Sequence, residues 1–249
     1  RPANVQAARL YALGLEKLRT ADALAARDLL LKAVEADPKH ADSWAALASV
    51  WSTLGYDAKS TEAAKHAVQL ASEFPREERL QFEGQSYEAE SQWDKAISSY
   101  RALFELEPDN IDNGLKLANA EIFGGQASQA MQTLARLRQL PAPRNEDLRI
   151  DLAEARAAHF LSDFKRERDI AVAAARKGEK QSARFLVARA RIAECLALRN
   201  MGDPKGAVSV CQEAQRIFEL AGDRYGVATT LNSIGNALYD LGDLDDARK

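Results

Sequence analysis

The sequence is poor in the residues that several classes of protein require. It has 249 residues but only two cysteines, which excludes a scaffold held together by many disulfides. No run of about 18 uncharged apolar residues occurs, so no membrane-spanning helix is predicted. The formal net charge is -3, without the basic surplus that binding to phosphate backbones requires. We therefore expect neither nucleic acid nor a membrane to be a partner of these residues.

Recognisable catalytic and cofactor-binding motifs are also missing. The three histidines, His40, His66 and His159, are far apart, and none has the spacing of a metal site. Gly124 and Gly125 lie between two predicted helices rather than after a strand, which indicates a turn and not a phosphate-binding loop. No nucleophile elbow or Ser–His–acid set is suggested. We predict that the chain is not an enzyme and has no catalytic, metal-binding or cofactor-binding residues and no cofactor.

What the sequence does contain is a pair of predicted helices that recurs along the chain. In each repeat the eighth position is small, and so is the fifteenth, which falls in the turn between the helices. Antiparallel helices approach closely only where side chains are small, and a single pair cannot bury its own apolar face, so successive pairs must stack. The eighth positions are Gly14, Ala48, Gly84, Ala118, Ala155, Cys195 and Gly235, and the fifteenth are Ala21, Gly55, Ser91, Gly125, Ser162, Gly202 and Gly242.

This periodicity predicts an all-α fold in which residues 1–249 form one solenoid. Bulky residues beside the small positions, namely Trp44, Trp51, Tyr87, Trp93 and Tyr100, are assigned to its core. The fifth repeat departs most from the pattern, with Asp151, Glu154 and Glu167 at positions that are normally apolar or small. The repeats lie near 7–40, 41–76, 77–110, 111–147, 148–187 and 188–227, followed by a partial repeat at 228–249.

The recurring positions resemble the tetratricopeptide repeat. The third repeat is the cleanest match, with Leu80, Gly84, Tyr87, Trp93, Ala96, Tyr100 and Pro108. The resemblance implies a right-handed superhelix whose first helices line a groove, and a role in binding a protein or peptide partner. Residues 11–67 more loosely resemble the repeat segment of bacterial receptor-type serine/threonine kinases. The alternative function is therefore a sensory or regulatory segment of a bacterial signalling kinase or transcription regulator.

The resemblance also implies which residues face the groove, because they recur at the second, fifth, ninth and twelfth places of each first helix. Residues 165–191 carry nine Lys or Arg against three Asp or Glu. Since arginine matches carboxylates and asparagine can bond a peptide backbone, we expect an acidic segment or a peptide C-terminus to bind here. The alternative is that these arginines are ordinary exterior charges. In repeats four to seven the groove places are Asn119, Arg149, Arg156, His159, Arg189, Arg199, Asn232, Asn236 and Tyr239.

The two cysteines, Cys195 and Cys211, both fall in the sixth repeat and should face the same helix pair. We favour small buried side chains there. The alternative is a disulfide or redox pair between two antiparallel helices, which would require an oxidising compartment.

The ends of the sequence lie beside or within helical patterns, so we expect a piece of a longer protein. The predicted helix 228–241 lacks most of its partner, which should leave Leu231, Ile234 and Leu238 exposed or covered by another molecule. A dimer through this C-terminal end is one way to cover them. No targeting segment is present, so the compartment stays open: cytoplasmic by default, extracytoplasmic if the chain belongs to a membrane-anchored receptor kinase.

Overall fold

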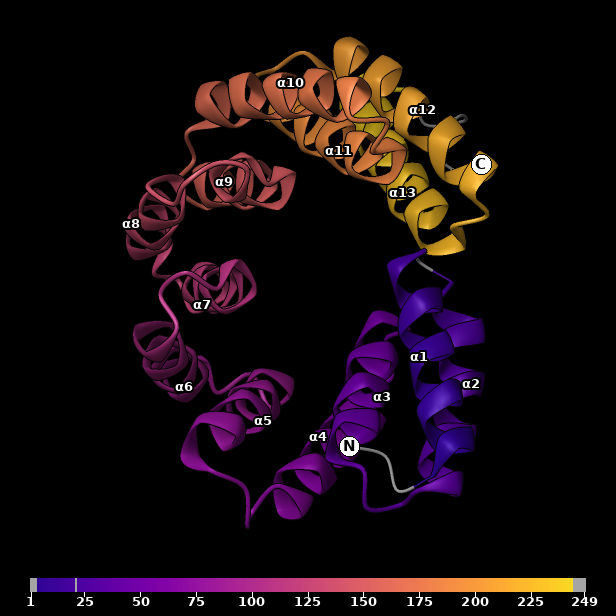
Figure 1. The fold of residues 1–249 in the computed structure, drawn as a ribbon. Coiled ribbons are helices and arrows are strands. Elements are labelled where there is room, and N and C mark those ends of the chain that lie inside the picture. Colours follow the sequence, from indigo (N-terminus) through magenta and orange to yellow (C-terminus); the bar gives the residue numbers. More distant parts are fainter. Residues whose placement is uncertain (1–3, 21, 244–249) are drawn as a thin grey trace. The chain divides into compact units, whose positions relative to one another are not determined.

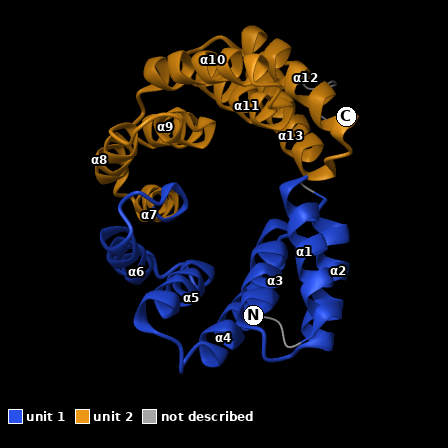
Figure 2. Cartoon of the chain, viewed as in Figure 1, with its two compact units in different colours: residues 1–113 blue, residues 114–249 orange. Residues whose placement is uncertain are grey.

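The computed structural model describes residues 4–20 and 22–243, and every regular element in these ranges is a helix. The chain divides into two compact units, residues 1–113 and 114–249, which Figure 2 distinguishes by colour. One fifteenth position of the repeating pattern, Ala21, lies outside the described residues. The all-α fold expected from the sequence is confirmed.

The first unit consists of three helix pairs and the start of α7. Each pair packs as an antiparallel hairpin, and the first helices of successive pairs also contact one another, α1 with α3 and α3 with α5. The bounds are α1 Val5–Arg19, α2 Ala23–Ala36, α3 Ala41–Thr53, α4 Asp57–Leu70, α5 Arg76–Ala89 and α6 Trp93–Leu106.

The second unit continues the same arrangement with longer helices toward its end. Helix α9 contacts α11, and α11 contacts α13, while α10 and α12 pack on the other side of this layer (Figure 1). The bounds are α7 Ile111–Phe123, α8 Ala127–Arg138, the short 3-10 helix η1 Arg144–Glu146, α9 Leu148–Phe160, α10 Phe164–Lys180, α11 Arg184–Asn200, α12 Pro204–Ala221 and α13 Arg224–Asp240.

The turns within the helix pairs are formed by the small residues at the fifteenth position of the repeats. These residues have a positive φ, a conformation that glycine adopts without steric cost and that ends a helix. After Gly55, for example, the N–H of Tyr56 donates to the carbonyl of Trp51 at 2.8 Å, which satisfies a carbonyl at the helix end. The prediction is confirmed at Gly55, Ser91, Gly125, Ser162, Gly202 and Gly242.

Two further turns of this kind join consecutive pairs, and the repeat pattern did not predict them. Ser182 and Gly222 also have positive φ values, and they lie before α11 and α13. Helices α10, α11 and α12 have 17, 17 and 18 residues, which accounts for the wider spacing of the later repeats.

The close approach at the eighth position is seen most clearly between α5 and α6. A Cβ atom on Gly84 would lie only 2.5 Å from the Tyr100 ring, which is 2% exposed and fills the space beside the glycine. The Tyr100 hydroxyl donates a hydrogen bond of 2.8 Å to Glu88. Core assignment is confirmed for Tyr100 and Trp51, whereas Trp44, Tyr87 and Trp93 are half-buried.

The two cysteines face each other across α11 and α12, as the repeat register predicts. Both are buried, which agrees with our favoured interpretation, but the structure joins Cys195 and Cys211 in a disulfide. Their Cα atoms are 5.6 Å apart, a spacing that a disulfide spans without backbone movement. The alternative weighed from the sequence is therefore the one that the structure shows.

The apolar face of α13 is less open than we expected. Leu231 is exposed, but Ile234 is buried and Leu238 is partly buried, because both pack against the cluster around the disulfide. The expectation was therefore wrong for Ile234: the hairpin with α12 already covers it. Among the described helices, none has the length and apolar character needed to cross a membrane.

We predict that Gly84→Ala destabilises the protein although alanine is the better helix former. The new methyl group would press on Tyr100, and overpacking costs about 1–3 kcal/mol, more than the roughly 0.5–1 kcal/mol that replacing a helical glycine contributes. Denaturant unfolding should show this loss, with the exposed α6 substitution Ser98→Ala as a control. An unchanged or raised unfolding free energy for Gly84→Ala would contradict the packing argument.

Candidate functional site

The nine groove residues predicted from the sequence all lie in the second unit, on α7, α9, α11 and α13. In Figure 1 these four helices form the inner layer of that unit, and α8, α10 and α12 form its outer layer. The four helices that carry the predicted groove residues thus share one layer and form its surface.

A cluster of two arginines and one asparagine occupies the part of this surface formed by α7, α9 and α11. Arg156 Nη1 donates to Asn119 Oδ1 at 2.9 Å, which links α9 to α7. The pKa of Arg156 is lowered, first by loss of solvent and then by the positive charge of Arg189 on α11. The positive charge of Arg189 thus acts against that of Arg156.

The surroundings of Arg189 contain little negative charge to offset this repulsion. Its pKa is lowered by desolvation, although Tyr225 and Asp223 on the neighbouring segment act in the opposite direction. Asp223 is occupied as the N-cap of α13, where it accepts hydrogen bonds from the N–H groups of Tyr225 and Gly226. Within the described residues, neither Arg156 nor Arg189 forms an ion pair.

Three other predicted residues are engaged with carboxylates of the same unit. Arg149 bonds Asp147, the N-cap of α9, with an Nη2–Oδ2 distance of 2.7 Å. Burial raises the pKa of Asp147, but the hydrogen bonds and charge of Arg149 outweigh it and leave that pKa lowered. Arg199 on α11 bonds Asp240 on α13, with Nε and Oδ2 2.6 Å apart. The third residue, His159, is paired with Glu167 on α10.

The remaining three predicted residues, Asn232, Asn236 and Tyr239, are exposed on α13. Their spacing of three and four residues places them on one face of the helix. They supply amide and hydroxyl groups that can both donate and accept hydrogen bonds.

The irregular fifth repeat replaces apolar packing by ion pairs. Arg138 on α8 holds Glu154 and Asp151 of α9, with its Nη2 2.7 Å from an oxygen of each. Lys177 on α10 bonds the other oxygen of Asp151 at 2.9 Å. The unusual acidic residues of this repeat thus join α8, α9 and α10, which sequence analysis did not predict although it flagged both carboxylates as departures.

The third departure, Glu167, is almost completely buried beneath His159. The His159 Nδ1 and Glu167 Oε2 atoms are 2.9 Å apart. The hydrogen bond to Glu167 raises the pKa of His159, and desolvation raises the pKa of Glu167 although His159 acts against it. This pair holds α9 against α10 and directs the His159 ring toward the outer layer.

Two exposed aromatic rings that the sequence pattern did not predict lie beside the arginine cluster. Phe123 and Phe160 are the last residues of α7 and α9, and they are 45% and 50% exposed. Their ring centroids lie 6.0 Å apart in an edge-to-face arrangement. The guanidinium carbon of Arg156 lies 5.7 Å from the centroid of Phe123. The sequence carries one signal of this: each phenylalanine follows a predicted groove residue, Asn119 or Arg156, by four positions.

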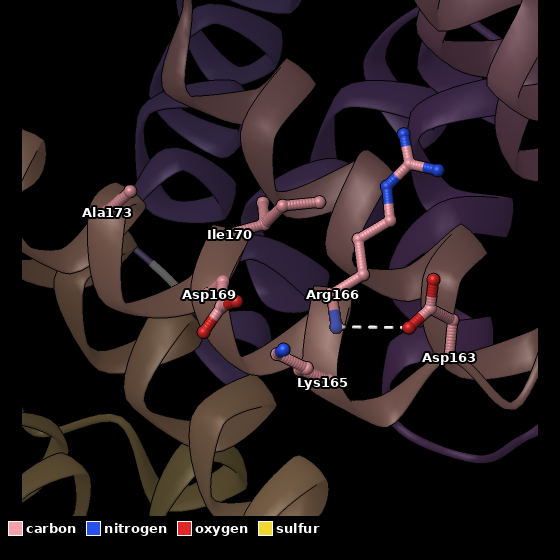
Figure 3. Close-up of a pocket in the computed structure, with 6 residues that line it drawn as sticks. All are labelled: Asp163, Lys165, Arg166, Asp169, Ile170 and Ala173. Carbon is pink, nitrogen blue, oxygen red and sulfur yellow. Dashed lines mark hydrogen bonds between the residues drawn. The ribbon is translucent and has the colours of Figure 1, made fainter.

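A separate depression of about 500 Å³ lies along the beginning of α10 (Figure 3). One helix and its N-cap line it, and in the figure Asp163 accepts a hydrogen bond from the backbone N–H of Arg166. Because it is open and has no groups converging from a second element, it offers no enclosed reaction site. The lining residues are Asp163, Lys165, Arg166, Asp169, Ile170 and Ala173. Over the described part of the chain, no group of three or more His, Cys, Asp or Glu could hold a metal ion.

Comparisons with known proteins agree with this architecture. The tetratricopeptide repeat family model matches residues 87–141. A thermophilic tetratricopeptide repeat protein of Thermus thermophilus is 16% identical, with a TM-score of 0.59 over 75% of this chain and 98% of that one. A Rap protein crystallised with competence and sporulation factor is 15% identical, with a TM-score of 0.62 over 97% of this chain and 73% of its own. No curated protein matches the sequence.

Stacked helix pairs with small residues at their contacts and positive-φ turns define the fold as a helical repeat solenoid. Together with the family match, this identifies residues 87–141 as tetratricopeptide repeat sequence within a chain whose described helix pairs follow the same architecture. Proteins of this fold characteristically serve as interaction scaffolds.

The His159–Glu167 pair predicts a pH dependence of stability with a definite sign. Both pKa values are raised in the folded state, above the ordinary 6.5 for His159 and 4.5 for Glu167, so the folded protein binds more protons than the unfolded one. The stabilisation from this pair is complete at pH values below the ordinary pKa values. It is lost as the pH rises through the raised pKa values of the folded state.

We therefore expect the pair to make the wild type less stable as the pH rises. The double substitution His159→Gln with Glu167→Gln should remove this pH-dependent loss. The unfolding free energy of the wild type, minus that of the double variant, should fall as the pH rises from 4.5 through 6.5 and beyond. Denaturant unfolding at a series of pH values measures this difference, and subtraction cancels titrations elsewhere in the chain. A difference that stays level or rises over this range would show that the pair is not coupled to folding as described.

Proposed function

We propose that this chain is a non-enzymatic scaffold that holds an acidic peptide segment of a protein partner on the inner layer of residues 114–249. The observation that carries the proposal is the position of Arg156 and Arg189, two neighbouring cations without an ion pair among the described residues. A bound carboxylate would offset their mutual repulsion and satisfy their free N–H groups.

Other arginines of the same unit support this argument by contrast. Arg138, Arg191 and Arg199 each bond at least one carboxylate of a neighbouring segment, as expected of charges that serve the fold. Keeping two guanidinium groups of like charge near each other without such a partner costs free energy, and costs of this kind are concentrated at binding sites.

The neighbouring polar groups fit an extended peptide. Asn119 accepts a hydrogen bond from Arg156 and fixes one edge of that guanidinium group, leaving its other N–H groups to an incoming anion. The exposed amides of Asn232 and Asn236 can pair with the N–H and C=O groups of a peptide backbone. A Rap protein of similar fold was crystallised with competence and sporulation factor, which supports a binding role for such a scaffold.

The test uses short synthetic peptides with blocked ends, one rich in Glu and one with Gln at the same places. We expect the wild type to prefer the Glu peptide, and Arg156→Glu with Arg189→Glu to weaken that binding by roughly tenfold or more, because the carboxylates would then meet like charges. Fluorescence anisotropy of labelled peptides at two salt concentrations measures both affinities.

The matched control is Arg176→Glu with Arg216→Glu, which makes the same change in net charge at exposed places on α10 and α12. Equal losses in both double variants would mean that the attraction is diffuse and would refute the assigned site. A third peptide, with Gln side chains and a free C-terminal carboxylate, tests whether the bound anion is a peptide C-terminus. If only this peptide binds, the ligand is a peptide C-terminus and the proposed acidic segment is wrong.

A further inference from the structure

The arginine cluster carries more positive charge than a single carboxylate neutralises. Arg156 and Arg189 are two cations without an ion pair among the described residues, and Arg189 is exposed. Asp223, a carboxylate whose charge reaches Arg189, is engaged as the N-cap of α13. A Glu or Asp side chain of a ligand brings one negative charge, whereas a phosphorylated serine brings about 1.5 to 2 at pH 7. A phosphoryl group therefore comes closer to balancing both arginines.

The two guanidinium groups also belong to different helices. Arg156 lies on α9 and Arg189 on α11, and these helices contact each other in the inner layer (Figure 1). A carboxylate is planar, and its two oxygens suit one bidentate arginine. A phosphoryl group is tetrahedral and has three acceptor oxygens, so arginines from two helices can bond it from different directions. The placement of the two cations thus favours the tetrahedral anion.

The contacts of Arg156 hold its guanidinium group in place and leave donors for a ligand. Its Nη1 donates to Asn119 Oδ1 at 2.9 Å, and its guanidinium carbon lies 5.7 Å from the centroid of the Phe123 ring. These contacts engage one nitrogen and one face of the group, whereas no described residue accepts a hydrogen bond from its Nε or Nη2. Because Asn119 accepts through its amide oxygen, its NH₂ group is the end that can donate to a bound anion.

We infer that the acidic segment is phosphorylated, and that the phosphoryl group of a phosphoserine or phosphothreonine binds Arg156 and Arg189, with the Asn119 amide as a further donor. The inference rests on the proposed function of the same surface. In the free protein the charge of Arg189 contributes, after desolvation, to the lowered pKa of Arg156. A bound dianion would counteract this contribution, because a nearby negative charge favours the charged form of an arginine.

The experiment measures the affinity of the wild type for end-blocked peptides that are identical except for one central residue, which is phosphoserine, Glu, Gln or Ser. Fluorescence anisotropy at about pH 7.5, where phosphoserine is mainly a dianion, gives the dissociation constants. We expect the phosphoserine peptide to bind roughly tenfold tighter than the Glu peptide. Equal affinity for these two peptides would overturn the inference, while a preference for Glu over Gln would leave the proposed function standing.

The pH dependence of this preference separates a site for a dianion from a generally basic surface. The second pKa of a phosphoryl group is about 6, whereas Glu ionises near a pKa of about 4.3. The ratio of the two affinities should therefore fall several-fold as the pH is lowered from about 7.5 to about 5. Both peptides meet the same protein, so the ratio cancels titration of nearby groups, namely His159 on α9, Glu167 on α10 and Asp223 before α13. A ratio that stays constant would contradict selection of the dianion.

Two variants test the assigned residues against a matched control. Arg189→Gln removes one exposed cation, and we expect the preference for phosphoserine over Glu to fall to about twofold or less. Asn119→Asp places a carboxylate beside Arg156 and should reduce the preference similarly, because the protein then supplies its own anion. The control Arg176→Gln makes the same change in charge at an exposed position of α10 and should keep the full preference. Equal losses in Arg189→Gln and Arg176→Gln would refute the site.

The remaining outcomes distinguish the inference from the proposed function, and the peptide series on the wild type decides even if a variant fails to fold. If neither phosphoserine nor Glu binds better than Ser and Gln, the proposed function has failed and the inference with it. If phosphoserine binds tightly and Glu binds no better than Gln, the inference stands and restricts the acidic segment to a phosphorylated one. Inorganic phosphate tests the free ion as the ligand. If it displaces the labelled phosphoserine peptide as well as an unlabelled phosphoserine peptide does, the surface recognises free phosphate and the proposal is overturned.

Discussion

The close contact between paired helices is the constraint on which the rest of the molecule depends. Gly84 leaves room for the Tyr100 ring, and Gly55 ends α3 in a conformation that disfavours other side chains. These two requirements, space at the contact and a left-handed turn beyond it, fix how each second helix folds back on the first. The first helices are thereby placed side by side, so their exposed faces become one continuous surface within each unit.

The fifth repeat shows that this scaffold tolerates a different kind of contact. Carboxylates at positions that are elsewhere apolar or small are held by Arg138, Lys177 and His159, so polar groups connect three successive helices. Because these cations are matched within the fold, the unmatched Arg156 and Arg189 stand out on the neighbouring face. Cations that pair with carboxylates join the helices, whereas Arg156 and Arg189 form no ion pair among the described residues. This difference is the basis of the proposed acidic site.

The sequence predicted the repeat architecture well because that architecture depends on local features, namely small residues and turns. The close contact at Gly84 and the turns at Ser91 and Ser162 could be placed from spacing alone. Pairings between helices could not, because the partner of Asp151 lies on another helix and no regular spacing leads to Arg138. The aromatic pair was missed for a related reason: Phe123 and Phe160 end their helices, where a repeating pattern does not distinguish an exposed ring from a buried one. The disulfide was recognised as an alternative, since the register placed both cysteines in one hairpin, but spacing does not report oxidation.

The Cys195–Cys211 bond has a consequence for how the array comes apart. Stacked repeats contact only their neighbours, so such arrays open progressively from their ends as the terminal hairpins detach. The covalent link fastens α11 to α12 across their buried interface, and α13 packs on the side chains around it. Opening that spreads along the array through α13 therefore meets a hairpin whose two helices remain joined. The cross-link limits how far such opening travels toward the helices that carry the arginine cluster.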